Sequence, residues 1–205
     1  LGYNGAERTI QAQKAHLEKN RHKIPLLFMT DVIHGYKTAF PSVLGLGATW
    51  DPELAEKTAC AAAAEAASAG VHVTFSPMAD LVRDARWGRV TESTGEDPYL
   101  NSLFTAAFVR GYQGDDISAP LKIASCVKHF VGYGAAEGGR DYDSTQIGEY
   151  SLWNDYLPPF ISAISEGCRL LMPAFHTIDG VPCTANRELL TDLLRGRLGF
   201  DGTVI

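Results

Sequence analysis

Residues 121–129 read LKIASCVKH, an apolar run that ends directly in two ionisable side chains, Lys128 and His129. A continuous apolar run of this kind is typical of a strand in a parallel sheet that is covered on both faces. Lysine rarely enters a protein core without a partner, because removing its charge from water is costly. The stretch therefore predicts a buried parallel strand whose carboxyl end faces a polar pocket.

Short apolar runs alternate with helix signals along the rest of the chain. We expect strands over 26–30, 71–75, 121–127 and 169–175, and the start of a fifth over 202–205. We expect helices over 6–23, 51–70, 97–112, 158–166 and 186–198, before and between these strands. Asp51 and Asp97 each precede a proline, which is an N-cap acid followed by proline at the first helical position. The alternation predicts an α/β fold with a parallel sheet and right-handed crossovers.

Charged and aromatic side chains are concentrated after the expected strands. In chain order they are Asp31 and His34, then Arg86, Trp87 and Arg89, then Lys128, His129 and Arg140, and finally the stretch MPAFHTIDG at 172–180. An open doubly wound sheet and a (β/α)8 barrel both fit the order of elements. Barrels place their sites at the carboxyl ends of their strands, so the clustering favours part of a TIM-type barrel, with about four and a half βα units present.

The composition excludes several classes of protein and partner. With 45% apolar and 20% charged residues the chain is an ordinary globular sequence. Its 24 acidic and 18 basic residues give a net charge of -6 without a basic cluster, so no nucleic acid is expected as a partner. No apolar run approaches the roughly 18 residues of a membrane span. The four cysteines lack the spacing of zinc ligands, so we expect buried free thiols, no metal and no cofactor.

Each polar residue also has a plainer structural interpretation. Asp31 could cap the turn that follows it, and Arg86 and Arg89 could form exposed ion pairs at the rim. Three histidines could be hydrogen-bonded loop or core residues: His34, His72 and His176. Lys128 fits this interpretation less well, because it follows an apolar strand directly.

A pocket at this edge of the sheet would offer a carboxylate, two cations and an imidazole donor, from Asp31, from Lys128 and Arg89, and from His129. Such a set suits a ligand rich in hydroxyl groups, and each charge-assisted hydrogen bond contributes about 1.5–3 kcal/mol. The predicted substrate is therefore a sugar. A lysine at a barrel strand end also fits the Schiff-base chemistry of an aldolase, and that alternative stays open at this point.

Several ordered motifs carry a resemblance to a known family. They are TDVIHG (30–35), RWGR (86–89) with GEDP (95–98), KHFVGYG (128–134) with GGRDY (138–142), LPPF (157–160), MPAF (172–175), and the stretch from IDGVP (178–182) to GFDGTVI (199–205). From about Ile24 to Ile205 the chain resembles the N-terminal barrel of glycoside hydrolase family 3, specifically its β-glucosidase branch. One motif would be weak evidence, whereas several in register are specific.

The resemblance implies that both catalytic carboxylates lie outside this chain. In the family the strand ending GFDG-x-VI continues into Ser-Asp-Trp, which would place the nucleophilic Asp two residues beyond Ile205. The general acid/base is a Glu of a later α/β domain. We therefore expect residues 1–205 to be the N-terminal portion of the barrel domain, and to be inactive alone. The partner would be the rest of the same polypeptide, with a homodimer as a further possibility.

The resemblance also assigns substrate-binding roles to seven residues: Asp31, Arg89, Lys128, His129, Arg140, Met172 and Phe175. It implies that Asp31 accepts hydrogen bonds from hydroxyls of the sugar in subsite -1 and that the basic residues surround the same ring. Arg140 matches an arginine in the loop after Lys-His, and Met172 and Phe175 line the pocket near the nucleophile.

The implied activity is that of a retaining, exo-acting β-glucosidase that hydrolyses terminal non-reducing β-D-glucosyl residues. The N-acetylglucosaminidase branch carries an Asp-Ser-His triplet after Lys-His-Phe, whereas this chain has Asp143-Ser144-Thr145. A β-xylosidase of the same family and a non-catalytic sugar-binding fragment are the alternatives. The resemblance favours a periplasmic or secreted location over a cytoplasmic one.

Overall fold

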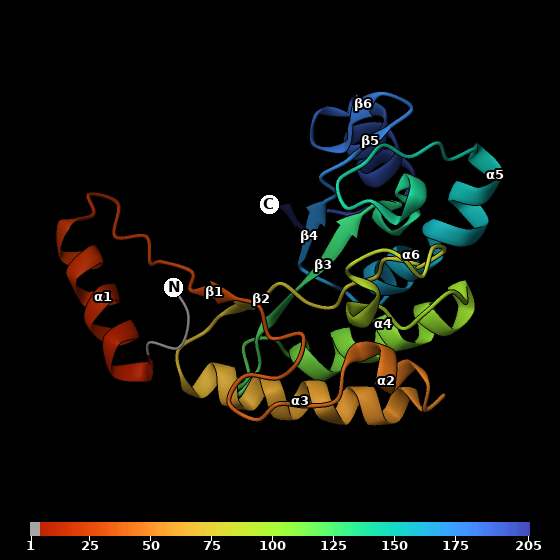
Figure 1. The fold of residues 1–205 in the computed structure, drawn as a ribbon. Coiled ribbons are helices and arrows are strands. Elements are labelled where there is room, and N and C mark those ends of the chain that lie inside the picture. The colour runs from red at the N-terminus through yellow and green to blue at the C-terminus, as the bar shows by residue number, and fades with distance from the viewer. Residues whose placement is uncertain (1–4) are drawn as a thin grey trace.

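The computed structural model describes residues 5–205, which form a five-stranded parallel sheet with helices packed against it (Figure 1). The strands lie in the order β1 (Met29–Thr30), β2 (Val73–Thr74), β3 (Ala124–Phe130), β4 (Leu170–Pro173) and β7 (Thr203–Val204). Each neighbouring pair is parallel. The predicted α/β class and parallel sheet are confirmed.

Helical segments connect successive strands and make the crossovers. The main helices are α1 (Gly5–Lys19), α2 (Val43–Gly47), α3 (Pro52–Ser68), α4 (Pro98–Gln113), α5 (Glu149–Ser151) and α6 (Pro158–Ser165). A π-helical segment, η6 (Glu188–Arg197), joins β4 to β7, and β5 (Thr177–Ile178) pairs with β6 (Val181–Pro182) in a small hairpin. The strands and crossovers thus form four strand–helix units and a fifth strand, as predicted.

The two Asp-Pro signals begin helices as expected. The carboxylate of Asp51 accepts a hydrogen bond from Leu54 N at 3.1 Å, and that of Asp97 accepts one from Leu100 N at 2.7 Å. Each bond satisfies a backbone donor that the first turn of a helix leaves unpaired. The helices α3 and α4 then lie side by side beneath the strands (Figure 1).

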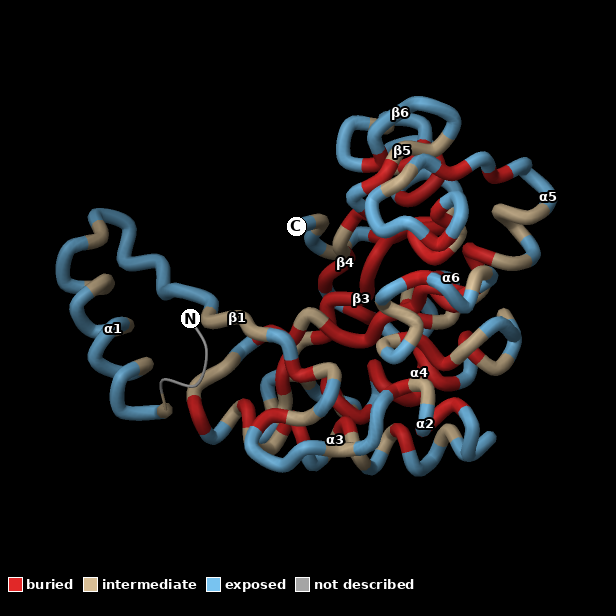
Figure 2. Tube along the Cα trace, in the orientation of Figure 1, coloured by how far each residue is buried: buried red, intermediate tan, exposed pale blue. Residues whose placement is uncertain are grey.

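The core lies between the sheet and these helices, where Figure 2 shows continuous buried backbone. One cluster surrounds β3 and β4 and includes Trp87, Phe130 and Phe160, which are almost wholly buried. A second cluster joins α3 and α4 through alanines and two phenylalanines. The helix α1 has no buried residue and lies at the side of this body (Figures 1 and 2), which it contacts where Thr9 Oγ1 donates a hydrogen bond to Ala69 O at 3.1 Å.

Several sequence predictions were wrong in their boundaries. The strands expected over 71–75 and 169–175 are limited to Val73–Thr74 and Leu170–Pro173, and three further differences have an identifiable cause. The strand expected over 26–30 is limited to Met29–Thr30, and Leu27 is exposed, because within residues 5–205 β1 pairs only with β2. The first helix ends at Lys19 and not at residue 23, since Asn20 donates its side-chain amide to Ile24 O and turns the chain.

No helix within residues 5–205 is long and apolar enough to cross a bilayer.

The third difference concerns the strand expected over 121–127, which runs over Ala124–Phe130. Backbone partners on both sides extend it: Lys128 N bonds to Pro77 O at 3.1 Å, and Phe130 O accepts from Ala174 N at 2.7 Å. Lys128 and His129 therefore lie within β3 and not after it. Sequence hydropathy could not show this, because backbone pairing and not side-chain polarity sets the strand end.

Candidate functional site

Lys128 and Asp31 form an ion pair between the carboxyl ends of β3 and β1. Lys128 Nζ lies 2.6 Å from Asp31 Oδ2. The lysine side chain is only 4% exposed, whereas the aspartate side chain is 46% exposed. Asp31 Oδ1 also accepts a hydrogen bond from Ile33 N at 3.2 Å, so it caps its turn as well as binding Lys128. Lys128 therefore brings a paired charge almost into the core.

A bulge in β3 determines the position of the next residue, His129. Lys128 pairs with Met172 and Phe130 pairs with Pro173, and the register shifts between these two pairs. A residue skipped in this way is freed from the regular alternation of a strand, and bulges often re-aim a side chain at a site. Consecutive residues of one strand can thus both contribute to the same polar region.

Arg89 lies beside His129 and is held by Glu92. Its Nε and Nη2 lie 2.7 and 2.8 Å from the two carboxylate oxygens of Glu92, and its Nη1 lies 3.2 Å from His129 Nε2. The hydrogen bond with Glu92 raises the pKa of Arg89. Burial would raise the pKa of Glu92, but the hydrogen bond and charge of Arg89 lower it overall, with help from the charge of Lys128. Both members of this pair are therefore charged.

Aromatic rings extend the site from the buried histidine towards solvent. The Phe175 ring lies 5.4 Å from the His129 ring, and the Tyr142 ring lies 5.7 Å from Phe175, both as centroid distances. Exposure rises along this row, from 2% for His129 to 53% for Phe175 and 63% for Tyr142. We call Phe175 and Tyr142 the aromatic ledge.

The carboxylate of Asp141, an exposed residue, holds the loop that carries Tyr142. Asp141 Oδ1 accepts a hydrogen bond from Trp87 Nε1 at 3.0 Å and another from the Tyr133 hydroxyl at 2.5 Å. Burial and this bond to Asp141 raise the pKa of Tyr133. Because Trp87 belongs to the loop after β2 and Asp141 to the loop after β3, the bonds tie two strand-end loops together.

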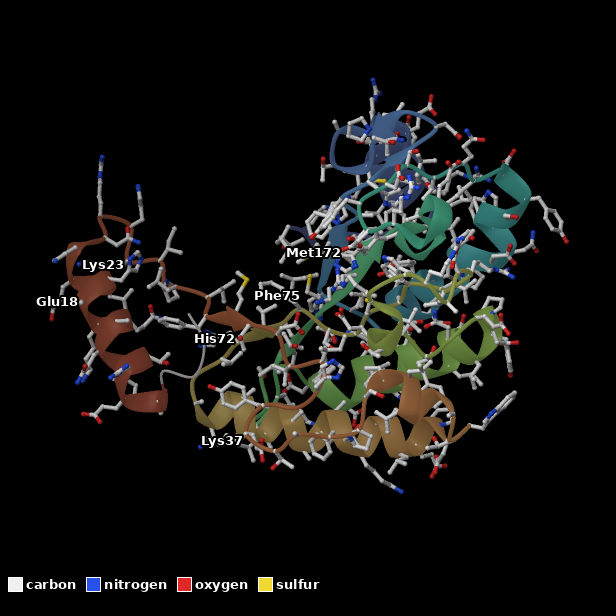
Figure 3. The ribbon with its side chains drawn as sticks, viewed as in Figure 1. Glu18, Lys23, Lys37, His72, Phe75 and Met172 are labelled. Carbon is white, nitrogen blue, oxygen red and sulfur yellow. The ribbon has the colours of Figure 1, made fainter. Side chains whose placement is uncertain are left out.

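The seven predicted site residues do not all meet. Asp31 with Lys128, and Arg89 with His129 and Phe175, form two adjoining groups at the strand ends. Met172 lies on β4 directly beside Lys128. Together with Phe75 (Figure 3), it packs against a small apolar cluster formed by Val73, Cys126 and Leu170. Arg140 is exposed, and its guanidinium has no hydrogen-bond or ion-pair partner among residues 5–205.

Sequence reasoning missed three residues of this region: Asp80, Glu92 and Tyr133. Asp80 bonds to the backbone N and to Nδ1 of His129. An acid soon after an expected strand was a usable signal for Asp80, and an acid three residues after Arg89 was one for Glu92. For Arg86 the plainer interpretation fits, because it forms an exposed ion pair with Asp84.

His176 is buried and stacks on Tyr133, with ring centroids 5.6 Å apart and planes 13° apart. Its Nε2 lies 3.9 Å from Cys183 Sγ. Burial lowers the pKa of His176 from 6.5 to about 4, and the neighbouring Asp80 and His129 act on it in opposite directions. The folded chain therefore holds this imidazole neutral.

Acid should destabilise the fold through His176. Between pH 6.5 and about 4 the unfolded chain binds a proton here that the folded chain excludes, so stability falls as the pH drops through this window. His176→Gln should remove about 2–3 kcal/mol of this pH dependence. The measurement is urea unfolding at pH 7 and pH 4.5, with the exposed His22→Gln as control. Equal pH dependence in His176→Gln and the unchanged protein would contradict the assignment.

Comparisons with known proteins show which family this chain resembles. The family model described as the glycosyl hydrolase family 3 N terminal domain matches residues 3–205. The chain is 38% identical over 195 residues to a periplasmic beta-glucosidase of Salmonella typhimurium and covers 95% of itself and 26% of that relative. It is 41% identical over 176 residues to a beta-xylosidase of Formosa agariphila, covering 84% of itself and 24% of that relative.

A solved structure is closer still. The chain matches a beta-glucosidase of Listeria innocua in complex with isofagomine at 51% identity and a TM-score of 0.97, covering 100% of this chain and 29% of that one. The chain thus spans about a quarter of the length of the curated relatives it matches. Since the family model takes in all but the first two residues, and the fold matches a solved member throughout, the chain belongs to glycosyl hydrolase family 3, within its N-terminal domain.

Proposed function

We propose that the protein containing this chain is a retaining, exo-acting β-glucosidase that hydrolyses terminal non-reducing β-D-glucosyl residues. The observation that carries the proposal is the nearly buried Lys128 paired with the half-exposed Asp31 next to the Arg89–His129 group. Charged donors and acceptors held this closely suit a ring that presents hydroxyls on several sides. The names of the relatives from Salmonella and Listeria support the choice of β-glucosides.

In this proposal the chain supplies binding and orientation, not the reacting carboxylates. Asp31 accepts hydrogen bonds from sugar hydroxyls, and Lys128 and Arg89 donate to them. Phe175 of the aromatic ledge and Met172, which lies beside Lys128, supply apolar surface. Arg140 belongs to the proposed set through the family motif alone. Hydrogen bonds that strengthen as positive charge develops on the ring favour the transition state over the bound substrate.

The proposed chemistry uses two carboxyl groups outside residues 1–205. A carboxylate two residues beyond Ile205 attacks the anomeric carbon while a Glu of a later domain protonates the departing oxygen. The C–O bond to the leaving group breaks as the covalent glycosyl–enzyme bond forms. Water, deprotonated by the same Glu, then releases the sugar with its original β configuration, a mechanism that needs carboxyl groups about 5–5.5 Å apart.

The decisive experiment follows p-nitrophenyl β-glucoside hydrolysis by the full-length protein with proton NMR. We expect β-glucose as the first product, followed by slow mutarotation. Release of α-glucose first would overturn the retaining mechanism, and absence of turnover would overturn the glucosidase assignment. Residues 1–205 alone should give no turnover, and turnover by that piece would overturn the placement of the carboxylates.

A β-xylosidase is the second candidate, because a relative bearing that name is 41% identical to this chain. The ratio of kcat/KM for p-nitrophenyl β-glucoside and β-xyloside decides between the two. We also propose a periplasmic or secreted location, which the name of the Salmonella relative supports. Fractionation of the source cells tests it, and a homodimer remains a prediction for sedimentation of the full-length protein.

A further inference from the structure

Asp80 is a fully buried carboxylate at the back of the site. Its side chain is 0% exposed, and its Oδ2 lies 3.1 Å from His129 N and 2.8 Å from His129 Nδ1. Its Oδ1 has no hydrogen-bond partner among the described residues. Burying a carboxylate with one oxygen unpaired is costly, and such groups in native proteins call for an explanation beyond packing.

The partners of His129 determine where its proton lies. A guanidinium can only donate hydrogen bonds, so Arg89 Nη1, 3.2 Å away, requires a lone pair on His129 Nε2. The remaining proton is therefore on Nδ1, which donates it to Asp80. His129 is the neutral Nδ1–H tautomer and presents an acceptor, not a donor, on the side that faces Arg89. This differs from the imidazole donor that the sequence suggested for the pocket.

The same bonds fix the plane of the Arg89 guanidinium. Glu92 takes the N–H groups of Nε and Nη2, and His129 takes one from Nη1. Three of the five guanidinium N–H groups are thus already hydrogen-bonded before any ligand binds, two of them to Glu92 and one to His129. If the His129 ring turned or changed tautomer, the Nη1 bond would be lost, and Arg89 would be held by Glu92 and by its contact with the Tyr133 ring.

We propose that Asp80 is a positioning residue that acts through His129 to hold Arg89 in its substrate-binding orientation. The inference rests on the proposed function for its kinetic consequence but not for the tautomer. Asp80 does not touch the sugar. It holds His129 with Nδ1 protonated, and His129 then holds the third donor of Arg89.

Two substitutions separate positioning from simple support of the fold. Both N–H groups of His129 reach the same oxygen of Asp80, so Asp80→Asn can place its amide oxygen there and keep both bonds. Asp80→Ala removes both. We expect Asp80→Asn to retain kcat/KM for p-nitrophenyl β-glucoside within about fivefold, and Asp80→Ala to lower it about 30-fold or more.

A double-mutant cycle in the full-length protein tests the route through Arg89. In an Arg89→Ala background, Asp80→Ala should lower kcat/KM by less than about threefold, because the residue it positions is already gone. If Asp80→Ala lowered kcat/KM by the same factor with and without Arg89→Ala, Asp80 would merely support the fold, and the proposal would be overturned. Thr105→Val is the matched control, since Thr105 is buried on α4 and bonds only to Asn101 by its side chain. It should change stability but not kcat/KM.

Nitrogen-15 NMR of the histidine-labelled protein provides a readout that needs no turnover. The signals lost in His129→Gln identify His129, and we expect a protonated Nδ1 and an unprotonated Nε2. Asp80→Asn should keep this tautomer and Asp80→Ala should lose it. A protonated Nε2 in the unchanged protein would overturn the proposal, even if the protein hydrolysed no glucoside, whereas the expected tautomer without turnover would count against the proposed function alone.

Discussion

Replacing Lys128 by methionine in the full-length protein should lower kcat/KM for an aryl β-glucoside about 100- to 1,000-fold. The lysine is nearly buried, and its charge lies 2.6 Å from Asp31. Under the proposed function, the substitution removes the contact of Lys128 with a sugar hydroxyl, and it leaves Asp31 without its cationic partner. Methionine keeps a flexible apolar side chain of similar length, so packing around β3 should change little. The measurement is initial rates over a range of substrate concentrations.

Lys37→Met is the control for this substitution. Lys37 is exposed at the surface near α3, away from the strand ends (Figure 3), and kcat/KM should stay within about twofold of the unchanged protein. Thermal unfolding of both variants separates loss of the site from loss of the fold. A Lys128→Met protein that is stable and hydrolyses glucosides at the normal rate would contradict the site assignment.

Gly134→Ala should lower the free energy of unfolding by about 3 kcal/mol, although it adds only one methyl group. A Cβ at this position would lie 2.2 Å from the carbonyl oxygen of Leu81 and 3.3 Å from the Trp87 ring. The first obstacle is backbone, which cannot swing away as a side chain can. The backbone of Gly134 does not have a positive φ, so the expected loss comes from the clash and not from conformational strain. Urea unfolding of the full-length protein measures it.

Gly148→Ala is the matched control. A Cβ there would meet no atom within 4 Å, and Gly148 has φ -65. Its stability should lie within about 0.5 kcal/mol of the unchanged protein. Equal losses in the two variants would show that the loops after β2 and β3 are not in close contact.

Local sequence signals predicted the helix starts and the buried strand well, because each of these features depends on residues close together in the sequence. Asp51 and Asp97 begin helices because a carboxylate and a following proline satisfy the first turn without help from elsewhere. The apolar run before Lys128 predicted a buried parallel strand, and in the structure this lysine is paired with Asp31. The family motifs lie at or after the carboxyl ends of the strands β1 to β4, in chain order.

The remaining features depend on distant parts of the chain. The bulge that re-aims His129 arises from its pairing with β4, about forty residues later in the sequence. The position of Asp80 soon after an expected strand marked it as a candidate, but nothing local identified its partner, because His129 is on another strand. Burial cannot be read from one residue either: Leu27 is exposed at a sheet edge, whereas Glu92 is half-buried against Arg89. Tertiary contacts decide each of these cases.

The bonds from Trp87 and Tyr133 to Asp141 bear on how such loops can diversify. In barrels, new specificities commonly arise by exchange of single strand-end loops on an unchanged scaffold. Here the loop after β2 supplies one donor and the loop after β3 supplies the acceptor, so a graft of either alone removes the partner of the buried Trp87 N–H. The two loops are therefore coupled, and we expect chimeras between relatives to retain their fold only when both loops come from the same parent.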